Sequence, residues 1–172
     1  FKICVGPDTI YGEDIQALRG IMEKGSYASG RGTSERGDVT EAYGNILHGN
    51  VQVRKGLRVV IDGGNGTGGH FILPILERFG CRVTALYCDM DGRFPNHFPD
   101  PTVPENLREL TERVLEEKAD VGIAFDGDGD RIGVVTDRGD ILWGDELLIL
   151  FSRFVLKERP GATVIGEVKC SH

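Results

Sequence analysis

The chain has 172 residues, 40% of them hydrophobic and 27% charged, which is an ordinary globular composition. Its 20 Lys and Arg against 27 Asp and Glu give a formal net charge of −7, which argues against a nucleic-acid-binding protein. The longest purely apolar run, Leu147–Phe151, is far shorter than the roughly 20 residues of a membrane-spanning helix, so we predict a soluble protein without membrane contact.

Cysteine usage predicts free thiols. The four cysteines include no CxxC pair and are too few and too irregularly spaced for a disulfide framework. We expect them to pack as small apolar residues in a reducing compartment, the cytoplasm. They are Cys4, Cys81, Cys88 and Cys170.

The first predicted elements are a short strand at 1–5 and an amphipathic helix at 13–24, whose apolar residues recur at helical spacing. Glycine and serine dominate 25–37, where no apolar period survives, so this stretch is expected to be a linker. A second amphipathic helix is expected to begin at Val39.

From residue 57 onward, predicted apolar strands alternate with helices. Strands are expected at 57–61, 82–87, 121–125, 132–136 and 162–166, and helices at 70–79, 105–118 and 144–157. The alternation predicts an α/β fold in which a parallel or mixed sheet is sandwiched between helices. Residues 39–140 form the one complete unit, and we expect the chain to be a fragment of a longer protein because its last strand stops almost at the chain end.

Three aspartates alternate with glycines directly after the apolar strand at 121–125: Asp126, Asp128 and Asp130. Because three adjacent carboxylates repel one another, a cation should compensate them, and oxygen-only ligands favour Mg²⁺ or Ca²⁺ over zinc. The glycines allow a short turn to bring the three side chains to one centre. We therefore predict a metal site here, with a solvated acidic turn as the alternative.

Two other protein classes share part of this pattern. An EF-hand loop that begins at Asp126 needs Gly and Glu where this chain has Arg131 and Asp137, so an EF-hand is excluded. A phosphatase of the haloacid-dehalogenase type uses the first aspartate as nucleophile and stays open, although its pattern has Thr or Val in place of Asp130.

A second glycine-rich turn spans 62–69. Gly64, Gly66 and Gly69 fit the G-x-G-x-x-G pattern between a predicted strand and a predicted helix, and Asp89 follows 20 residues after Gly69. These residues would suit an NAD-binding oxidoreductase module. The favoured interpretation is a tight strand-to-helix turn whose glycines permit close packing.

A proline-rich loop and two lysines are the remaining candidates. Four of the seven prolines fall within 94–104, and because proline restricts φ, this loop is expected to have a fixed shape. His97 within it is interpreted as a hydrogen-bonded strut, with a role as ligand or acid/base left open. Lys2 and Lys169 lie beside predicted strands, where a lysine can contact a phosphate or act as an acid/base, or can simply be a surface charge.

The acidic loop at 126–131, followed by Ile132–Val135, resembles the metal-binding loop of the α-D-phosphohexomutases, and most closely that of the bacterial phosphomannomutase/phosphoglucomutase branch. Further stretches resemble the same branch: 62–66, 94–97, 99–101 with 104–107, and 168–171. Members of this family have four domains. The resemblance implies that 1–38 end domain 1, 39–140 form domain 2 and 141–172 begin domain 3.

The resemblance also implies a reaction. In the family, a phosphoserine passes its phosphoryl group to a hexose monophosphate, and a hexose 1,6-bisphosphate intermediate leads to interconversion of the 1- and 6-phosphates of mannose or glucose. The implied roles are Mg²⁺ binding for Asp126, Asp128 and Asp130, phosphate contact for Arg131, acid/base or phosphate contact for Lys2, and substrate contact for Lys169. The phosphoserine loop would precede Phe1 and the remaining domains would follow His172, so we predict no turnover by this chain without the rest of its parent protein. A cation-binding structural domain without chemistry also stays open.

Overall fold

The computed structural model describes residues 3–171 and divides the chain into two compact units, 1–38 and 39–172. In the first unit, β1 (Cys4–Val5) pairs antiparallel with β2 (Asp8–Thr9), and the helix α1 (Glu13–Lys24) follows. The helix predicted at 13–24 is confirmed. The strand predicted at 1–5 is found at Cys4–Val5, and residues 1–2 lie outside the described part of the chain.

A five-stranded sheet forms the centre of the second unit, with the strand order β4-β3-β5-β6-β7. The strands are β3 (Arg58–Asp62), β4 (Arg82–Leu86), β5 (Val121–Phe125), β6 (Ile132–Thr136) and β7 (Ile141–Leu142). β3 runs parallel to both β4 and β5, whereas β6 is antiparallel to β5 and β7 is antiparallel to β6. The connection from β5 to β6, 126–131, is too short for a parallel crossover, so β6 must return antiparallel.

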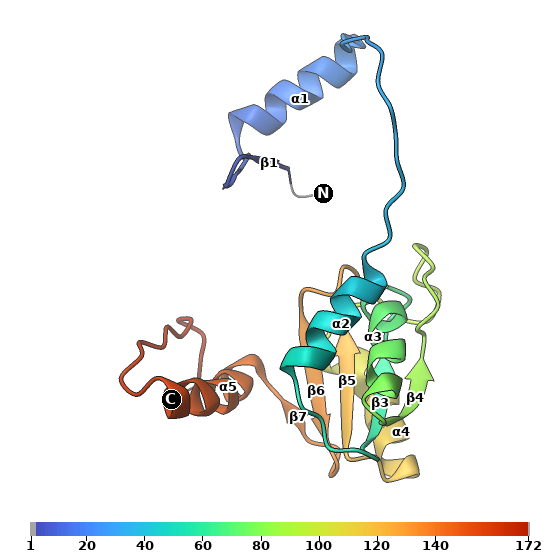
Figure 1. Ribbon diagram of the computed structural model, residues 1–172, viewed down its shortest axis with the longest axis vertical. Helices are drawn as coiled ribbons and strands as arrows, with labels where there is room; N and C mark the ends of the chain where they lie inside the picture. The colour runs from blue at the N-terminus through green and yellow to red at the C-terminus, as the bar shows by residue number, and fades with distance from the viewer. Residues whose placement is uncertain (1–2, 172) are drawn as a thin grey trace. The chain divides into compact units, whose positions relative to one another are not determined.

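Helices cover both faces of this sheet, which confirms the predicted α/β class with a mixed sheet. The helices of the second unit are α2 (Thr40–Asn50), α3 (Thr67–Arg78), α4 (Arg108–Glu117), which continues the 3₁₀ turn η1 (Pro104–Leu107), and α5 (Gly144–Glu158). Figure 1 shows α2 and α3 together on one side of the sheet. On the other side, α4 packs against β3, β5 and β6.

The core has two layers because side chains alternate along a strand. Val60 of β3 faces the α4 side, where it joins a buried cluster with Leu110 and Val114 of α4. Its neighbours Val59 and Ile61 face the opposite side, where side chains of α3 cover them. Strand β3 is therefore buried on both faces, as a central parallel strand should be.

One predicted strand is wrong: residues 162–166 are neither helix nor strand. A strand needs a neighbour to pair its backbone N–H and C=O groups, and within residues 3–171 no strand lies beside this segment. Four other elements start one to three residues away from the prediction: α2 at Thr40, β3 at Arg58, α3 at Thr67 and α4 at Arg108.

The cysteines follow the expectation in part. Cys81 and Cys88 are buried in the apolar layer beside α3, whereas Cys4 is exposed and Cys170 is half-buried. All four are free thiols.

Among residues 3–171, none of the helices combines the length and the hydrophobicity that crossing a membrane requires.

Candidate functional site

The acidic loop and the glycine-rich turn lie against each other because they follow the neighbouring parallel strands β5 and β3. The Thr67 N–H donates to the Gly127 carbonyl oxygen at 3.1 Å. A Cβ on Gly66 would lie 2.7 Å from that same oxygen, so only glycine fits at this contact. The carboxyl ends of parallel strands are where α/β sheets bind ligands, and this pair of loops occupies that edge.

The acidic loop brings its three aspartates to one centre. One carboxylate oxygen from each of Asp126, Asp128 and Asp130 lies within 4.8 Å of the others. Asp126 is buried, with 2% of its surface exposed, while Asp128 and Asp130 are exposed. Gly129 lies between Asp128 and Asp130 and has a φ of +73°. This left-handed backbone conformation, which would be strained for a residue with a side chain, turns the loop at this point.

Arg131 closes this loop onto Asp126. Its backbone N–H donates to Asp126 Oδ1 at 3.0 Å, and its guanidinium Nε donates to Asp126 Oδ2 at 2.7 Å. Burial raises the pKa of Asp126, but the two hydrogen bonds and the charge of Arg131 outweigh this effect and hold the pKa below its ordinary value. Asp126 is therefore ionised at neutral pH.

The charges and donor atoms of the loop suit a divalent cation. Three carboxylates and one guanidinium leave a local charge that one divalent cation balances. The side-chain donors that converge at the centre are three carboxylate oxygens, a donor set that suits Mg²⁺ or Ca²⁺ better than zinc.

The proline-rich loop is fixed onto the glycine-rich turn by two polar contacts. His97 Nε2 lies 3.0 Å from Oδ2 of the fully buried Asp62, and Asn96 Nδ2 donates to Asn65 Oδ1 at 2.7 Å. His97 Nδ1 also lies 3.0 Å from the Phe98 carbonyl oxygen. These contacts match the strut interpretation of His97, because both ring nitrogens are occupied by groups of the chain itself.

The same loop carries Asp100 to Arg131. Asp100 Oδ1 lies 3.3 Å from Arg131 Nη1 and also accepts hydrogen bonds from the N–H and the hydroxyl of Thr102, at 3.0 and 2.7 Å. These Thr102 hydrogen bonds hold the pKa of Asp100 below its ordinary value, although burial opposes them. No role was predicted for Asp100 or Asp62 from the sequence. A carboxylate between two prolines, as in Pro99–Pro101, was the available signal for Asp100.

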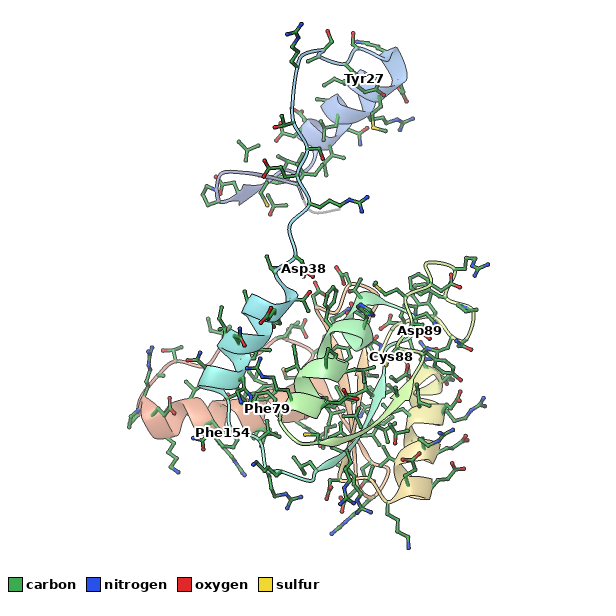
Figure 2. All side chains as sticks on the ribbon, turned by 45° about the vertical axis from the view of Figure 1, so that its right-hand side comes forward. Tyr27, Asp38, Phe79, Cys88, Asp89 and Phe154 are labelled. Carbon is green, nitrogen blue, oxygen red and sulfur yellow. The ribbon has the colours of Figure 1, made fainter. Side chains whose placement is uncertain are left out.

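The glycines proposed for a dinucleotide are covered by the chain itself. A Cβ on Gly64 would lie 2.8 Å from Pro99, and a Cβ on Gly69 would lie 2.8 Å from Cys88 Sγ. In a dinucleotide-binding site, the backbone of these glycines must be accessible, so that the pyrophosphate can approach it closely. Asp89 is exposed after the end of β4 (Figure 2), and its carbonyl oxygen accepts from Asn65 Nδ2. The geometry therefore favours the packing interpretation of this turn over the NAD-binding one.

Of the two candidate lysines, Lys169 alone lies within the described residues. Lys2 lies outside residues 3–171, so its role stays a prediction. Lys169 is exposed, and its backbone N–H donates to Glu167 Oε2 at 2.9 Å. No hydrogen bond or ion pair joins its side chain to the aspartates in the part of the chain that is described.

Comparison with known proteins decides the family. The model of the family "Phosphoglucomutase/phosphomannomutase, alpha/beta/alpha domain II" matches residues 40–139, more than half of the chain. The chain belongs to the phosphoglucomutase/phosphomannomutase family. This result confirms the resemblance noted from the acidic loop.

Individual relatives agree with this assignment. A phosphomannomutase/phosphoglucomutase of Pseudomonas aeruginosa is 47% identical over 171 residues, and a phosphoglucomutase of Neisseria gonorrhoeae is 44% identical over 171 residues. The match covers 99% and 98% of this chain but 37% of each relative, so the chain spans little more than a third of their length. A crystal structure of a phosphoglucomutase/phosphomannomutase family protein from Burkholderia thailandensis superimposes with a TM-score of 0.80 at 40% identity, covering 89% of this chain and 33% of that one.

Proposed function

We propose that this chain is the metal-binding part of a Mg²⁺-dependent phosphohexomutase that interconverts the 1- and 6-phosphates of a hexose such as mannose or glucose. The observation that carries the proposal is the convergence of three carboxylates within 4.8 Å beside an arginine, in a chain of this family. The names of the relatives, phosphomannomutase and phosphoglucomutase, support the choice of substrates. The expected ligands are a hexose monophosphate and a hexose 1,6-bisphosphate.

Within such an enzyme, 1–38 would end the first domain, 39–140 would form the second, and 141–172 would begin the third. The family match at 40–139 and the division of the chain into compact units after Asp38 both support the first boundary. The rest of the parent chain would then be the partner of this segment, and the reducing cytoplasm stays the predicted compartment.

The roles of the loop residues follow from their charge and position. Asp126, Asp128 and Asp130 would hold Mg²⁺, which when bound neutralises charge on a phosphoryl group in transfer. Arg131 keeps guanidinium N–H groups beyond those on Asp126 and Asp100, and these can donate to the oxygens of the same phosphoryl group. Asp126, held by Arg131 and buried, would fix the orientation of the loop.

The other groups needed for turnover would come from elsewhere. Lys2 is proposed as an acid/base or phosphate contact, and Lys169 as a contact to the substrate. The phosphoserine would precede Phe1 in the parent protein. We therefore propose that turnover needs groups from the rest of the parent protein in addition to those of this segment.

The test is an assay of the full-length protein that contains this chain. Glucose 1-phosphate or mannose 1-phosphate is supplied with Mg²⁺ and a trace of the 1,6-bisphosphate, and formation of the 6-phosphate is followed. We expect turnover that falls at least about 100-fold in Asp128→Asn, because a metal ligand is lost. Unaltered turnover in Asp128→Asn, or no turnover by the unsubstituted protein, would contradict the proposal.

The matched control is Asp137→Asn. This substitution removes the same charge from an exposed aspartate in the turn between β6 and β7. Because β6 starts at the acidic loop and ends before that turn, Asp137 lies at the opposite end of the strand. We expect the control variant to keep the turnover of the unsubstituted protein.

A further inference from the structure

The guanidinium of Arg131 is held by two carboxylates from different segments of the chain. Nε donates to Asp126 Oδ2 at 2.7 Å, within the acidic loop, and Nη1 lies 3.3 Å from Oδ1 of Asp100, in the proline-rich loop. The side chain of Arg131 is 52% exposed, so packing alone does not fix it. Its orientation therefore depends mainly on these two close contacts, since its third carboxylate neighbour, Asp130, lies farther away at 4.0 Å.

Asp100 is held in place by contacts that do not involve Arg131. Its Oδ1 accepts the two hydrogen bonds from Thr102, and its own carbonyl oxygen accepts from Asn106 Nδ2 at 2.9 Å. Its loop is in turn fixed to the glycine-rich turn by the contact between His97 and Asp62. A carboxylate that is already ordered loses little conformational entropy when it pairs with a flexible side chain. Asp100 can therefore fix the position of Arg131.

A competing position for the guanidinium lies close by. Arg131 Nε already lies 4.0 Å from Asp130 Oδ1, at the outer limit of an ion pair, and Asp130 is exposed. A small rotation of the arginine side chain would bring the guanidinium onto this outer carboxylate. Such a pairing would neutralise one of the charges that the acidic cluster offers to a cation.

We propose that Asp100 is a positioning residue that keeps Arg131 from pairing more closely with Asp130 than the 4.0 Å observed, so that the carboxylates of Asp128 and Asp130 stay available to a divalent cation and the remaining guanidinium N–H groups stay available to a phosphate. The inference rests on the proposed metal site of this chain. It adds a residue outside the acidic loop to the groups that determine cation affinity. Its action is indirect, through Arg131.

A double-mutant cycle on the full-length protein tests this coupling. Mg²⁺ affinity is measured by calorimetry for the unsubstituted protein, Asp100→Asn, Arg131→Ala and the double variant, with Asp128→Asn defining the signal of this site. Asparagine keeps the oxygen that accepts from Thr102 but removes the charge that holds Arg131. We expect Asp100→Asn to weaken Mg²⁺ binding roughly three- to tenfold, and to change it less than about twofold when Arg131 is already alanine.

Two further variants separate positioning from other effects. Asp91→Asn removes a carboxylate of the same region that pairs with Arg93 instead of Arg131, and should leave Mg²⁺ affinity unchanged. Thr102→Val keeps every charge but removes the hydroxyl that donates to Asp100. Like Asp100→Asn, it should weaken Mg²⁺ binding, and only in a protein that retains Arg131. The second variant also answers the question if Asp100→Asn fails to fold.

The outcomes are distinguishable. An equal loss of Mg²⁺ affinity on Asp100→Asn with and without Arg131 would mean a general charge effect and would overturn the positioning role. So would an unchanged affinity in both Asp100→Asn and Thr102→Val. If the unsubstituted protein binds no Mg²⁺ through Asp128, the proposed metal site fails and this inference fails with it.

Discussion

His97 and Asp62, 35 residues apart in the sequence, form an ion pair with 3.0 Å between Nε2 and Oδ2. Asp62 ends the interior strand β3 and has no exposed surface, while His97 belongs to the proline-rich loop. The other ring nitrogen of His97 faces the Phe98 carbonyl oxygen. Because both neighbours are hydrogen-bond acceptors, both ring nitrogens should carry a hydrogen, and the imidazole should be cationic.

This pair predicts how stability depends on pH. The hydrogen bond to Asp62 raises the pKa of His97 above its ordinary value, although burial lowers it in part. A pKa raised by folding means that the stabilisation is complete below the unfolded pKa and is lost as pH rises through the folded pKa. We expect His97→Gln to lower the free energy of unfolding clearly at about pH 6 and much less at about pH 9.

Urea denaturation of the unsubstituted chain and of His97→Gln at several pH values provides this measurement. A matched His70→Gln variant, which alters an exposed histidine of α3, should show no such trend. A difference that grows with rising pH would contradict the assigned charge of His97.

We predict that a single methyl group added at Gly122 disturbs the packing of α4 on β5. It is buried in β5, and a Cβ there would lie 2.6 Å from Val114 Cγ2 and 2.9 Å from Leu110 Cδ1 of α4. We expect Gly122→Ala to lower the free energy of unfolding by about 1–3 kcal/mol, because α4 must move or strain to admit the methyl group. Thermal unfolding monitored by circular dichroism measures the effect.

Gly92→Ala is the control for that substitution. A Cβ at Gly92 meets no atom within 4 Å, and its backbone φ is not in the left-handed region. This variant should match or slightly exceed the unsubstituted stability. Equal melting temperatures for the two alanine variants would show that α4 does not pack as closely on β5 as the structure indicates.

The covered glycine-rich turn predicts that NADH does not bind. Pro99 and Cys88 lie against the glycines that a pyrophosphate would need to approach. A fluorescence titration should therefore show no saturable change. Saturable binding that weakens in Asp89→Ala would instead support the oxidoreductase interpretation.

We predict that lysine cannot replace Arg131. Its Nε and Nη1 reach two carboxylates at once, on Asp126 and Asp100, whereas the single ammonium of lysine offers one point charge. We expect Arg131→Lys to lower kcat of the full-length enzyme at least about tenfold, as loss of a phosphate contact in the transition state does. Arg138→Lys, in the exposed turn after β6, should retain the kinetics of the unsubstituted enzyme, and an unaffected Arg131→Lys would remove the arginine from the proposed machinery.

The sequence predicted structure correctly where a residue pattern is compatible with only one local conformation. Apolar runs such as Val121–Phe125 predicted the buried strands, and the alternation of strands with helices predicted the α/β class. The spacing of Asp126, Asp128 and Asp130 predicted carboxylates that converge, since glycine between them leaves a tight turn as the compact conformation. The resemblance carried by the same loop predicted the family that the comparisons confirm.

Contacts between distant segments could not be predicted in this way. Nothing in the local sequence of Asp100 indicates that it meets Arg131, because the two are brought together only when the proline-rich loop folds over the ends of β3 and β5. The strand expected at 162–166 failed for a related reason, since apolar composition does not supply a pairing partner. Pairing and side-chain partners depend on tertiary structure, whereas strand propensity is local.

The most direct test of the central claim is a Mg²⁺ titration of the full-length protein, its Asp128→Asn variant and its Asp137→Asn variant. We predict that the unsubstituted protein and Asp137→Asn bind one Mg²⁺ at this loop with similar affinity, and that Asp128→Asn loses at least about tenfold in affinity. Equal Mg²⁺ affinity in all three proteins would show that the converging aspartates of the acidic loop do not hold the ion.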